Sequence, residues 1–217
     1  MKLPTSILVL LVLSMISCDK NNDSQEEQLV DPNFYALTVG NSWEYQYFKR
    51  IDRTEEYESI DAFDNVTITA TTEINGNVFY IFETVTSGDD TSTCVPENGT
   101  VITKLRDSLG YLIDENGIKQ FSYSNPNQEY LISESSNDVK IYGVLSESEA
   151  TLEFPAGNFL CSVNERYARF SGGDKSPGTD YYFYSKEIGQ IKTTCSWVSD
   201  SIPILEKRLV SYNINAN

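Results

Sequence analysis

The chain has 217 residues, enough for one domain with a core of its own, and its 32 acidic residues outweigh its 16 basic ones to give a net charge of −16. That charge disfavours nucleic acid as a partner, because the phosphates would be repelled, and it disfavours docking on anionic lipid through a basic patch. The sequence has no histidine. Catalytic Ser-His-Asp and Cys-His sites and histidine-ligated zinc are therefore excluded, and we expect a protein that is not an enzyme and holds neither a metal nor a cofactor.

The first 17 residues have the pattern of a secretory signal. Lys2 supplies a positive start, an apolar run too short to span a bilayer follows over Ile7–Ile16, and Ser17-Cys18 closes it. The stretch resembles a bacterial lipoprotein signal peptide, in which cleavage falls before the cysteine and the new N-terminal cysteine is acylated. The resemblance implies that residues 1–17 are removed and that acyl chains on Cys18, palmitate among them, anchor the protein to a lipid bilayer. The alternative is a plain secretory signal in which Cys18 is incidental.

The residues that follow the cysteine are polar. This composition predicts that residues 18–30 form a flexible tether. Acidic residues so close to the cysteine resemble the start of surface lipoproteins in Bacteroidota-type bacteria, which implies the outer membrane of the cell envelope and exposure at the cell surface. In enterobacterial lipoproteins, an Asp directly after the cysteine, as Asp19 is here, implies retention at the inner membrane. The two sorting rules conflict, so the membrane and its face stay open.

Beyond the tether, apolar and polar residues alternate as in β-strands. Trp43, Tyr45 and Tyr47 alternate with polar residues, which is typical of a half-buried strand, and Asn75-Gly76 between two such runs predicts a tight hairpin. No segment has a helical period over eleven or more residues, and only one short helical turn is expected, at residues 34–37. The expected strands cover residues 43–47, 66–71, 78–85, 101–105, 111–113, 118–123, 130–133, 139–145, 152–154, 159–167, 181–185, 191–197 and 204–214.

Turn signals recur at short spacing, and no interior linker separates them. We therefore expect an all-β fold, a single antiparallel curved sheet shaped as a half-barrel or a sandwich, with little helix after the signal peptide, in one domain over residues 31–217. Residues 171–179 hold three Gly and one Pro, and this composition predicts an exposed, mobile loop.

Two phrases in the chain resemble those of known lipoproteins. Residues 37–45 resemble the "L-x-V-G-N-x-W-x-Y" start of many Bacteroidota lipoproteins. A later pair of phrases resembles the "P-A-G-x-F" and "Y-Y-x-x-G-x-G-x-V-K" of an uncharacterised β-rich family of lipoproteins and periplasmic domains, although Glu187 stands where the family more often has Gly. The resemblance implies a curved antiparallel sheet or half-barrel, distantly like carriers that wrap acyl chains. The matching residues are Leu37, Val39, Gly40, Asn41, Trp43, Tyr45, Pro155, Ala156, Gly157, Phe159, Tyr181, Tyr182, Lys186, Ile188, Gly189, Ile191 and Lys192.

Three cysteines remain besides the one at the signal. Because an exported protein meets an oxidising compartment, one disulfide among Cys94, Cys161 and Cys195 is possible, with three choices of pair. Cys161 and Cys195 lie on the apolar faces of expected strands and equally fit small core positions, whereas Cys94 lies in a polar loop. A catalytic cysteine is not expected, because no histidine is present to activate it.

Two further groups of residues are candidate sites with simpler explanations. The acidic clusters at 61–64, 89–90 and 114–116 have the oxygen-rich composition that calcium favours but lack the spacing of a calcium loop, so we interpret them as solvated turns. A second group of aromatic side chains could line a face that binds sugar or peptide, but aromatic residues on strands more often form a core. These are Tyr45, Tyr47, Tyr80, Tyr181, Tyr182, Tyr184 and Trp197.

Together these features predict a non-enzymatic, membrane-anchored lipoprotein of the cell envelope that binds a small ligand or an envelope partner protein. One alternative is a carrier or chaperone for an acyl chain or a lipoprotein, which needs an apolar cavity. A second is a carboxylate-based hydrolase, which needs two acidic side chains facing one cleft. The strand pattern indicates no such pair.

Overall fold

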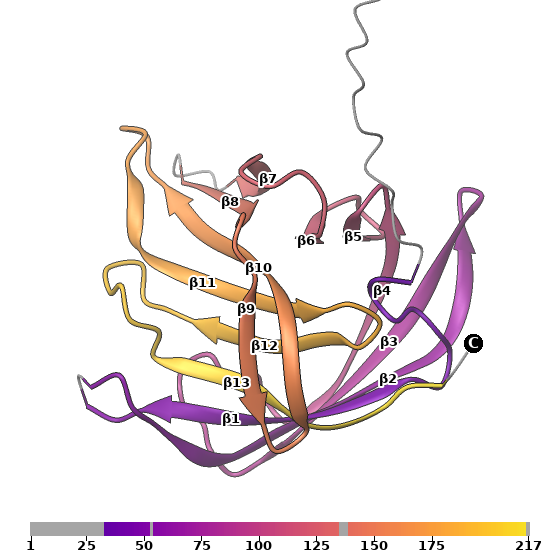
Figure 1. Cartoon of the computed structure of the whole chain (residues 1–217), viewed down its shortest axis with the longest axis horizontal. Coiled ribbons are helices and arrows are strands. Elements are labelled where there is room, and N and C mark those ends of the chain that lie inside the picture. The colour runs from indigo at the N-terminus through magenta and orange to yellow at the C-terminus, as the bar shows by residue number, and fades with distance from the viewer. Residues whose placement is uncertain (1–32, 53, 135–138, 216–217) are drawn as a thin grey trace, which may run out of the picture.

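The structure, a computed structural model, describes residues 33–52, 54–134 and 139–215 (Figure 1). These residues form a single antiparallel β-sheet that curls until it is nearly closed into a barrel, and they include no helix. The prediction of an all-β fold with one curved sheet is therefore confirmed, in the half-barrel form and not as a sandwich. The expected signal peptide, the tether and the lipidation site Cys18 lie outside the described residues and stay predictions. No helix of the described part is long and apolar enough to cross a membrane.

Thirteen strands make up the sheet, in the order β6-β5-β4-β3-β2-β1-β13-β12-β11-β10-β8-β7, with β9 paired to the first part of β10. Consecutive strands are mostly neighbours, as in a meander. One exception is the pairing of β1 with β13, which joins the first and last strands in the middle of the sheet. The others are that β8 pairs with β10, and that β6 and β7 lie at opposite ends of the strand order. The strands are β1 (Ser42–Arg50), β2 (Tyr57–Ile74), β3 (Asn77–Gly88), β4 (Gly99–Ser108), β5 (Tyr111–Asp114), β6 (Lys119–Ser122), β7 (Tyr130–Glu134), β8 (Lys140–Leu145), β9 (Ala150–Phe154), β10 (Gly157–Arg169), β11 (Lys175–Ser185), β12 (Gly189–Cys195) and β13 (Leu205–Asn213).

The predicted hairpin at Asn75-Gly76 is confirmed between the two long strands β2 and β3. Both residues have positive φ, 51° and 76°, as the tight turn of a two-residue hairpin requires. The short helical turn predicted at residues 34–37 is wrong. The chain makes a tight turn there, in which the Ala36 N–H donates to the Asn33 carbonyl and Ala36 takes a φ of 52°.

The mobile loop predicted over residues 171–179 is also wrong in its second half, because β11 begins at Lys175. Ser176, Gly178 and Thr179 are buried. The Gly178 N–H donates to the Val198 carbonyl, and a Cβ at Gly178 would lie 2.0 Å from the carbonyl oxygen of Trp197. Gly178 therefore permits the backbones of β11 and of residues 197–198 to approach closely. The glycine at this position is required for packing and does not indicate a loop.

The two phrases of the family resemblance contact each other in the structure. The Trp43 indole Nε1 donates to the Ile188 carbonyl at 2.6 Å, and the Tyr45 hydroxyl donates to the Gln190 carbonyl at 2.9 Å. Gly189 lies against the Trp43 ring, where a Cβ would come within 3.4 Å. Glu187 has a φ of 62°, in the left-handed region that favours glycine, which gives a physical reason for the Gly that the family phrase carries there.

The β9–β10 hairpin lies across the outside of the curl, in front of β12 and β13 in Figure 1, and β9 contacts β13. Phe159 and Cys161 of this hairpin belong to the largest buried cluster, together with Ile191 and Leu209 from the strands beneath. A second cluster packs Phe34 and Tyr35 against Leu112 and Phe121. The hydrophobic core is thus distributed around the sheet, and some members of both clusters, such as Trp43 and Leu112, also line the concave interior.

The two edge strands of the sheet, β6 and β7, are joined by side-chain hydrogen bonds and not by paired backbones. Asn164 of β10 is fully buried, donates from Nδ2 to the Ser122 carbonyl at 2.7 Å and accepts the Ser122 N–H at Oδ1 at 2.9 Å. The Tyr130 hydroxyl of β7 donates to the same Oδ1 at 2.6 Å. The Asn164 amide thereby replaces the missing neighbour strand of β6 and keeps the half-barrel curled.

Candidate functional site

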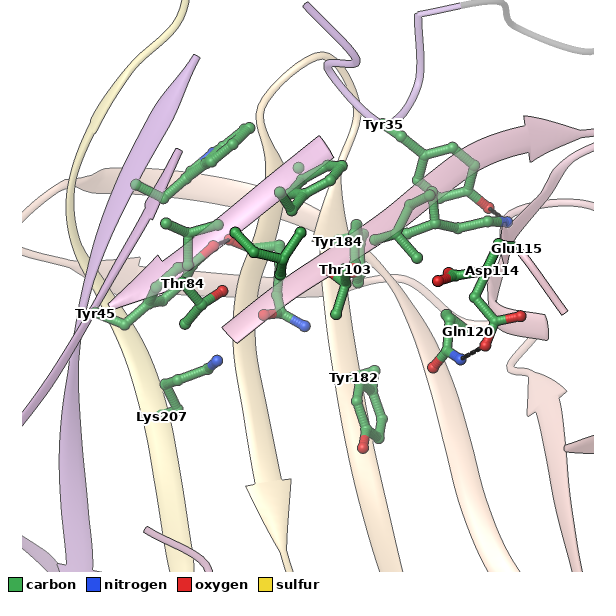
Figure 2. A pocket seen from close by; sticks show the side chains of 18 of the residues that line it. Tyr35, Tyr45, Thr84, Thr103, Asp114, Glu115, Gln120, Tyr182, Tyr184 and Lys207 are labelled. Atoms are coloured by element: carbon green, nitrogen blue, oxygen red, sulfur yellow. Dashed lines mark hydrogen bonds between the residues drawn. The ribbon is translucent and has the colours of Figure 1, made fainter. Parts of the chain in front are cut away.

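A cavity of about 470 Å³ opens inside the curl (Figure 2). Its volume falls in the range of small-molecule sites. Side chains reach it from β1 to β5 on one side and from β10 to β13 on the other, and Ile102 and Thr103 of β4 are exposed at its edge. The lining residues are Tyr35, Trp43, Tyr45, Val66, Phe82, Thr84, Ile102, Thr103, Leu105, Leu112, Asp114, Glu115, Gln120, Arg166, Tyr182, Tyr184, Gly189, Gln190 and Lys207.

One part of the lining is apolar and aromatic. The rings of Trp43 and Phe82 stack with their centroids 6.2 Å apart, and Val66, Leu105 and Leu112 line the cavity as well. Trp43 is held by its hydrogen bond to Ile188, so the ring has a fixed orientation. Such rigid rings offer flat faces for the apolar side of a ligand.

The rest of the lining is polar, and several hydroxyls lack partners. Within the described residues, Thr84, Thr103, Tyr182 and Tyr184 make no side-chain hydrogen bond, although all four line the cavity. Burial raises the pKa of Tyr184 well above its usual value, so its hydroxyl keeps its proton at neutral pH and can act as a donor. Hydroxyls that find no partner in the protein are available to a ligand or to water.

The inner wall carries a buried ion pair. Asp64, 2% exposed, accepts hydrogen bonds from the Tyr47 hydroxyl at 2.8 Å and the Thr86 hydroxyl at 2.7 Å, and the Lys207 ammonium lies 3.1 Å from its Oδ2. Burial, and next the Asp64 charge, raise the pKa of Tyr47. The interpretation of residues 61–64 as a solvated turn is therefore wrong for Asp64, which is an internal residue of β2.

The acidic cluster at 114–116 does form a turn. Asp114 Oδ1 accepts the N–H groups of Asn116 and Ile118, each at 2.9 Å, while Glu115 lies 3.7 Å from the Lys104 ammonium. Nowhere in the described ranges do three or more Cys, Asp or Glu side chains gather in a way that could hold a metal ion.

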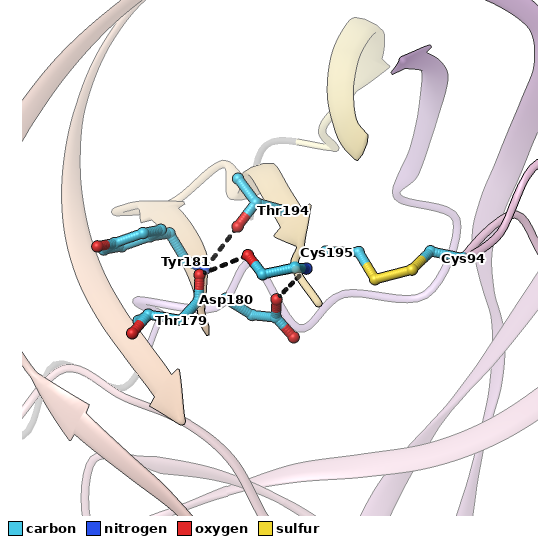
Figure 3. Close-up of a disulfide and its surroundings, with 7 residues drawn as sticks. Cys94, Thr179, Asp180, Tyr181, Thr194 and Cys195 are labelled. Carbon is cyan, nitrogen blue, oxygen red and sulfur yellow. Dashed lines mark hydrogen bonds between the residues drawn. A yellow bond between two sulfur atoms is a disulfide. The ribbon is translucent and has the colours of Figure 1, made fainter. Parts of the chain in front are cut away.

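Cys94 and Cys195 form a disulfide, and Cys161 is a buried thiol (Figure 3). The bridge joins the loop between β3 and β4 to the end of β12, across 101 residues of sequence. Burial raises the pKa of the Cys161 thiol to about 12, so it stays protonated and is a poor nucleophile. A smaller cavity of about 340 Å³ lies against the disulfide and shares Tyr182 and Lys207 with the first.

The structure divides the seven aromatic candidates. Tyr45, Tyr182 and Tyr184 line the 470 Å³ cavity, and Tyr47 lines the cavity at the disulfide. Tyr80 packs against the largest buried cluster, the Tyr181 ring lies 6.4 Å from that of Phe183, and Trp197 is exposed. Sequence reasoning missed Trp43, Phe82, Arg166 and Lys207 as lining residues. The available signal was alternation: Trp43 shares a strand face with Tyr45, and Arg166 shares one with Asn164.

No protein-family model and no curated protein sequence matches the chain. Two solved structures have a similar fold. One, from Bacteroides fragilis, is described as an exported protein with a YmcC-like fold; it superposes with a TM-score of 0.55 at 10% identity, over 84% of this chain and 100% of that one. The other, from Parabacteroides distasonis, is described as a lipoprotein and has a TM-score of 0.52 at 12% identity, over 84% and 99%. At such identities the likeness is one of fold, and it is consistent with the lipoprotein resemblance.

Proposed function

We propose that this protein is a non-enzymatic lipoprotein of the cell envelope, held to the outer membrane by acylated Cys18, whose half-barrel binds a small ligand in its interior. The observation that carries the binding function is the 470 Å³ cavity, in which rigid aromatic rings lie beside hydroxyls that have no partner in the described residues. An interior that served only as a core would be filled by apolar side chains. The exported and lipoprotein descriptions of the two structural neighbours support the location.

The geometry favours the two alternatives less. An acyl chain in this cavity would cover the threonine and tyrosine hydroxyls without giving them hydrogen-bond partners, which costs free energy. A carboxylate hydrolase would need two acids free to act on one substrate. Of the acids that line the cavity, Asp114 is held by backbone donors and Glu115 faces Lys104.

Anchoring is tested by growing cells with a labelled fatty acid. The wild-type protein is expected to take up the label, because Cys18 would carry the acyl chains, and Cys18→Ala is expected to lose it. Labelling of the Cys18→Ala protein would contradict the lipidation site.

Ligand binding is tested by native mass spectrometry of the lipoprotein extracted from its own envelope. The wild-type protein is expected to carry the mass of one small molecule. Thr84→Phe is expected to carry none, because the new ring would occupy the cavity that Thr84 lines. Thr100→Phe is the matched control, since it makes the same substitution at an exposed position of β4 and should retain the ligand. Equal occupancy in wild type and Thr84→Phe would place the ligand elsewhere.

A further inference from the structure

Arg166 is the feature of the cavity that the proposed function leaves unexplained. The side chain is half-buried, and its guanidinium lies over the Tyr182 ring at 3.7 Å from the centroid. Its Nη2 donates to the Gln120 backbone carbonyl. The Nε is buried and has no hydrogen-bond partner, and Nη1 makes no hydrogen bond within the described residues. The position of the guanidinium is therefore fixed while part of its hydrogen-bonding capacity is unused.

No carboxylate of the described residues forms an ion pair with Arg166. Asp180 is its direct neighbour across β10 and β11, yet the Asp180 carboxylate accepts the Ser196 N–H at 2.6 Å (Figure 3). Burial raises the pKa of Asp180, and the Ser196 hydrogen bonds and the Arg166 charge act against that rise, but Arg166 and Asp180 form no ion pair.

Arg50 and Arg208 are half-buried as well, but Arg50 pairs with Asp200 at 2.6 Å and Arg208 with Glu206 at 2.7 Å. Half-buried Arg106 also has no ion-pair partner in the part of the chain that the structure describes, but it does not line the cavity. A half-buried cation that no carboxylate contacts is costly, and an anion bound in the cavity would offset that cost.

Among the described residues, the cavity lining holds two cations, and they differ. Lys207 pairs with Asp64, whereas no carboxylate of the described residues lies within ion-pair distance of Arg166. Of the lining acids, Glu115 lies 3.7 Å from the Lys104 ammonium, and Asp114 accepts two backbone N–H groups. Arg166 is therefore the cation of the lining that is available to pair with a bound anion. A carboxylate suits it, because guanidinium and carboxylate are both planar and form strong charge-assisted hydrogen bonds.

We propose that the ligand is a compact organic acid, a hydroxyl-bearing ring with one carboxylate. This inference rests on the proposed function. The carboxylate binds the guanidinium of Arg166, and one ring face lies against Trp43 and Phe82. The hydroxyls of the ring bind Tyr182, Tyr184 and Thr84, which are labelled in Figure 2. Sugar acids and phenolic acids share this chemistry, and the experiment distinguishes them.

The test uses Trp43 as a reporter. The chain has two tryptophans, so Trp197→Phe leaves only Trp43, which lines the cavity. The probes are two matched pairs: glucuronate with glucuronamide, and 4-hydroxyphenylacetate with 4-hydroxyphenylacetamide. In at least one pair, the acid is expected to change the Trp43 fluorescence with an affinity about tenfold or more above that of the amide, as a charge-assisted hydrogen bond gives. The pair that responds identifies the ring as a sugar or a phenol.

Arg166→Gln and Arg166→Lys are then made in the same background. Arg166→Gln is expected to remove the preference for the acid, and Arg166→Lys to reduce it, because the ammonium lacks the planar fork. Arg106→Gln is the matched control: Arg106 also has an unpartnered Nε, but it lies over Phe79 and does not line the cavity. The Arg106→Gln variant should bind the acid in preference to the amide as strongly as the protein without this substitution does.

Equal binding of acid and amide would overturn the inference while leaving ligand binding in the cavity intact. A preference that survives in Arg166→Gln would also overturn it, as would a failure of both acids to alter the Trp43 fluorescence. The comparison of acid with amide needs no Arg166 variant, so it decides the matter even if Arg166→Gln does not fold. An empty cavity in the extracted lipoprotein would instead contradict the proposed function itself.

Discussion

The double variant Cys94→Ser/Cys195→Ser is expected to lose about 2–5 kcal/mol of unfolding free energy relative to the wild-type protein. The disulfide closes a stretch of 101 residues, and the loss of freedom that so long a loop imposes on the unfolded chain corresponds to about 4.7 kcal/mol in the chain-entropy account. It also fixes the β3–β4 loop against the end of β12, where Cys94 and Cys195 pack with Tyr47, Ala62 and Leu205. Urea unfolding followed by circular dichroism measures the change.

The matched control for the disulfide is Cys161→Ala. Cys161 is a fully buried free thiol, so its truncation costs only the packing of one small side chain, about 1 kcal/mol. Dithiothreitol should lower the stability of the wild type and of Cys161→Ala alike, and should leave the double variant unchanged. A double variant as stable as the wild type would show that the bridge does not constrain the unfolded chain.

A large loss of stability is also expected when the buried pair of Asp64 and Lys207 is broken. Lys207→Met should destabilise the protein by about 3–5 kcal/mol, because it leaves the buried Asp64 carboxylate without its cation. The hydroxyls of Tyr47 and Thr86 still donate to Asp64, but neither supplies a charge. Thermal and urea unfolding of the variant measure the loss.

A double-mutant cycle separates the pair from its surroundings. Asp64→Asn/Lys207→Met is expected to be less destabilised than the sum of the two single variants, because no buried charge is left uncompensated. Lys104→Met removes the cation from the exposed pair with Glu115 and should change stability by less than about 1 kcal/mol. Additive effects of Asp64→Asn and Lys207→Met would show that the two charges do not act as a pair.

Much of the fold could be predicted from the sequence, because local patterns carry it. Alternation at Trp43, Tyr45 and Tyr47 identified β1, and Asn75-Gly76 identified the β2–β3 hairpin, since the turn needs two residues with positive φ. The pairing of β1 with β13 could not be predicted. It joins residues 156 to 171 positions apart, and no local pattern specifies such a partner.

The site was less predictable than the fold. Alternation shows which side chains face inward, but it does not show whether they meet in the middle or leave a cavity. Asp64 looked like part of an acidic turn, because only the folded chain brings Lys207 to it. The missing counter-ion of Arg166 likewise depends on the direction of the Asp180 carboxylate, which is set by Ser196. Asn164, which bonds to Ser122 of β6 and to Tyr130 of β7, is polar and fully buried, and the sequence does not reveal this combination.

A ligand enclosed by the half-barrel would be visible in a crystal structure of the lipoprotein purified from its own envelope without a refolding step. The expected result is non-protein density between Trp43, Thr84 and Tyr184, with a negatively charged group at the guanidinium of Arg166. An interior that holds only ordered water, or one that closes until Phe82 and Tyr184 touch, would contradict a ligand site in the half-barrel.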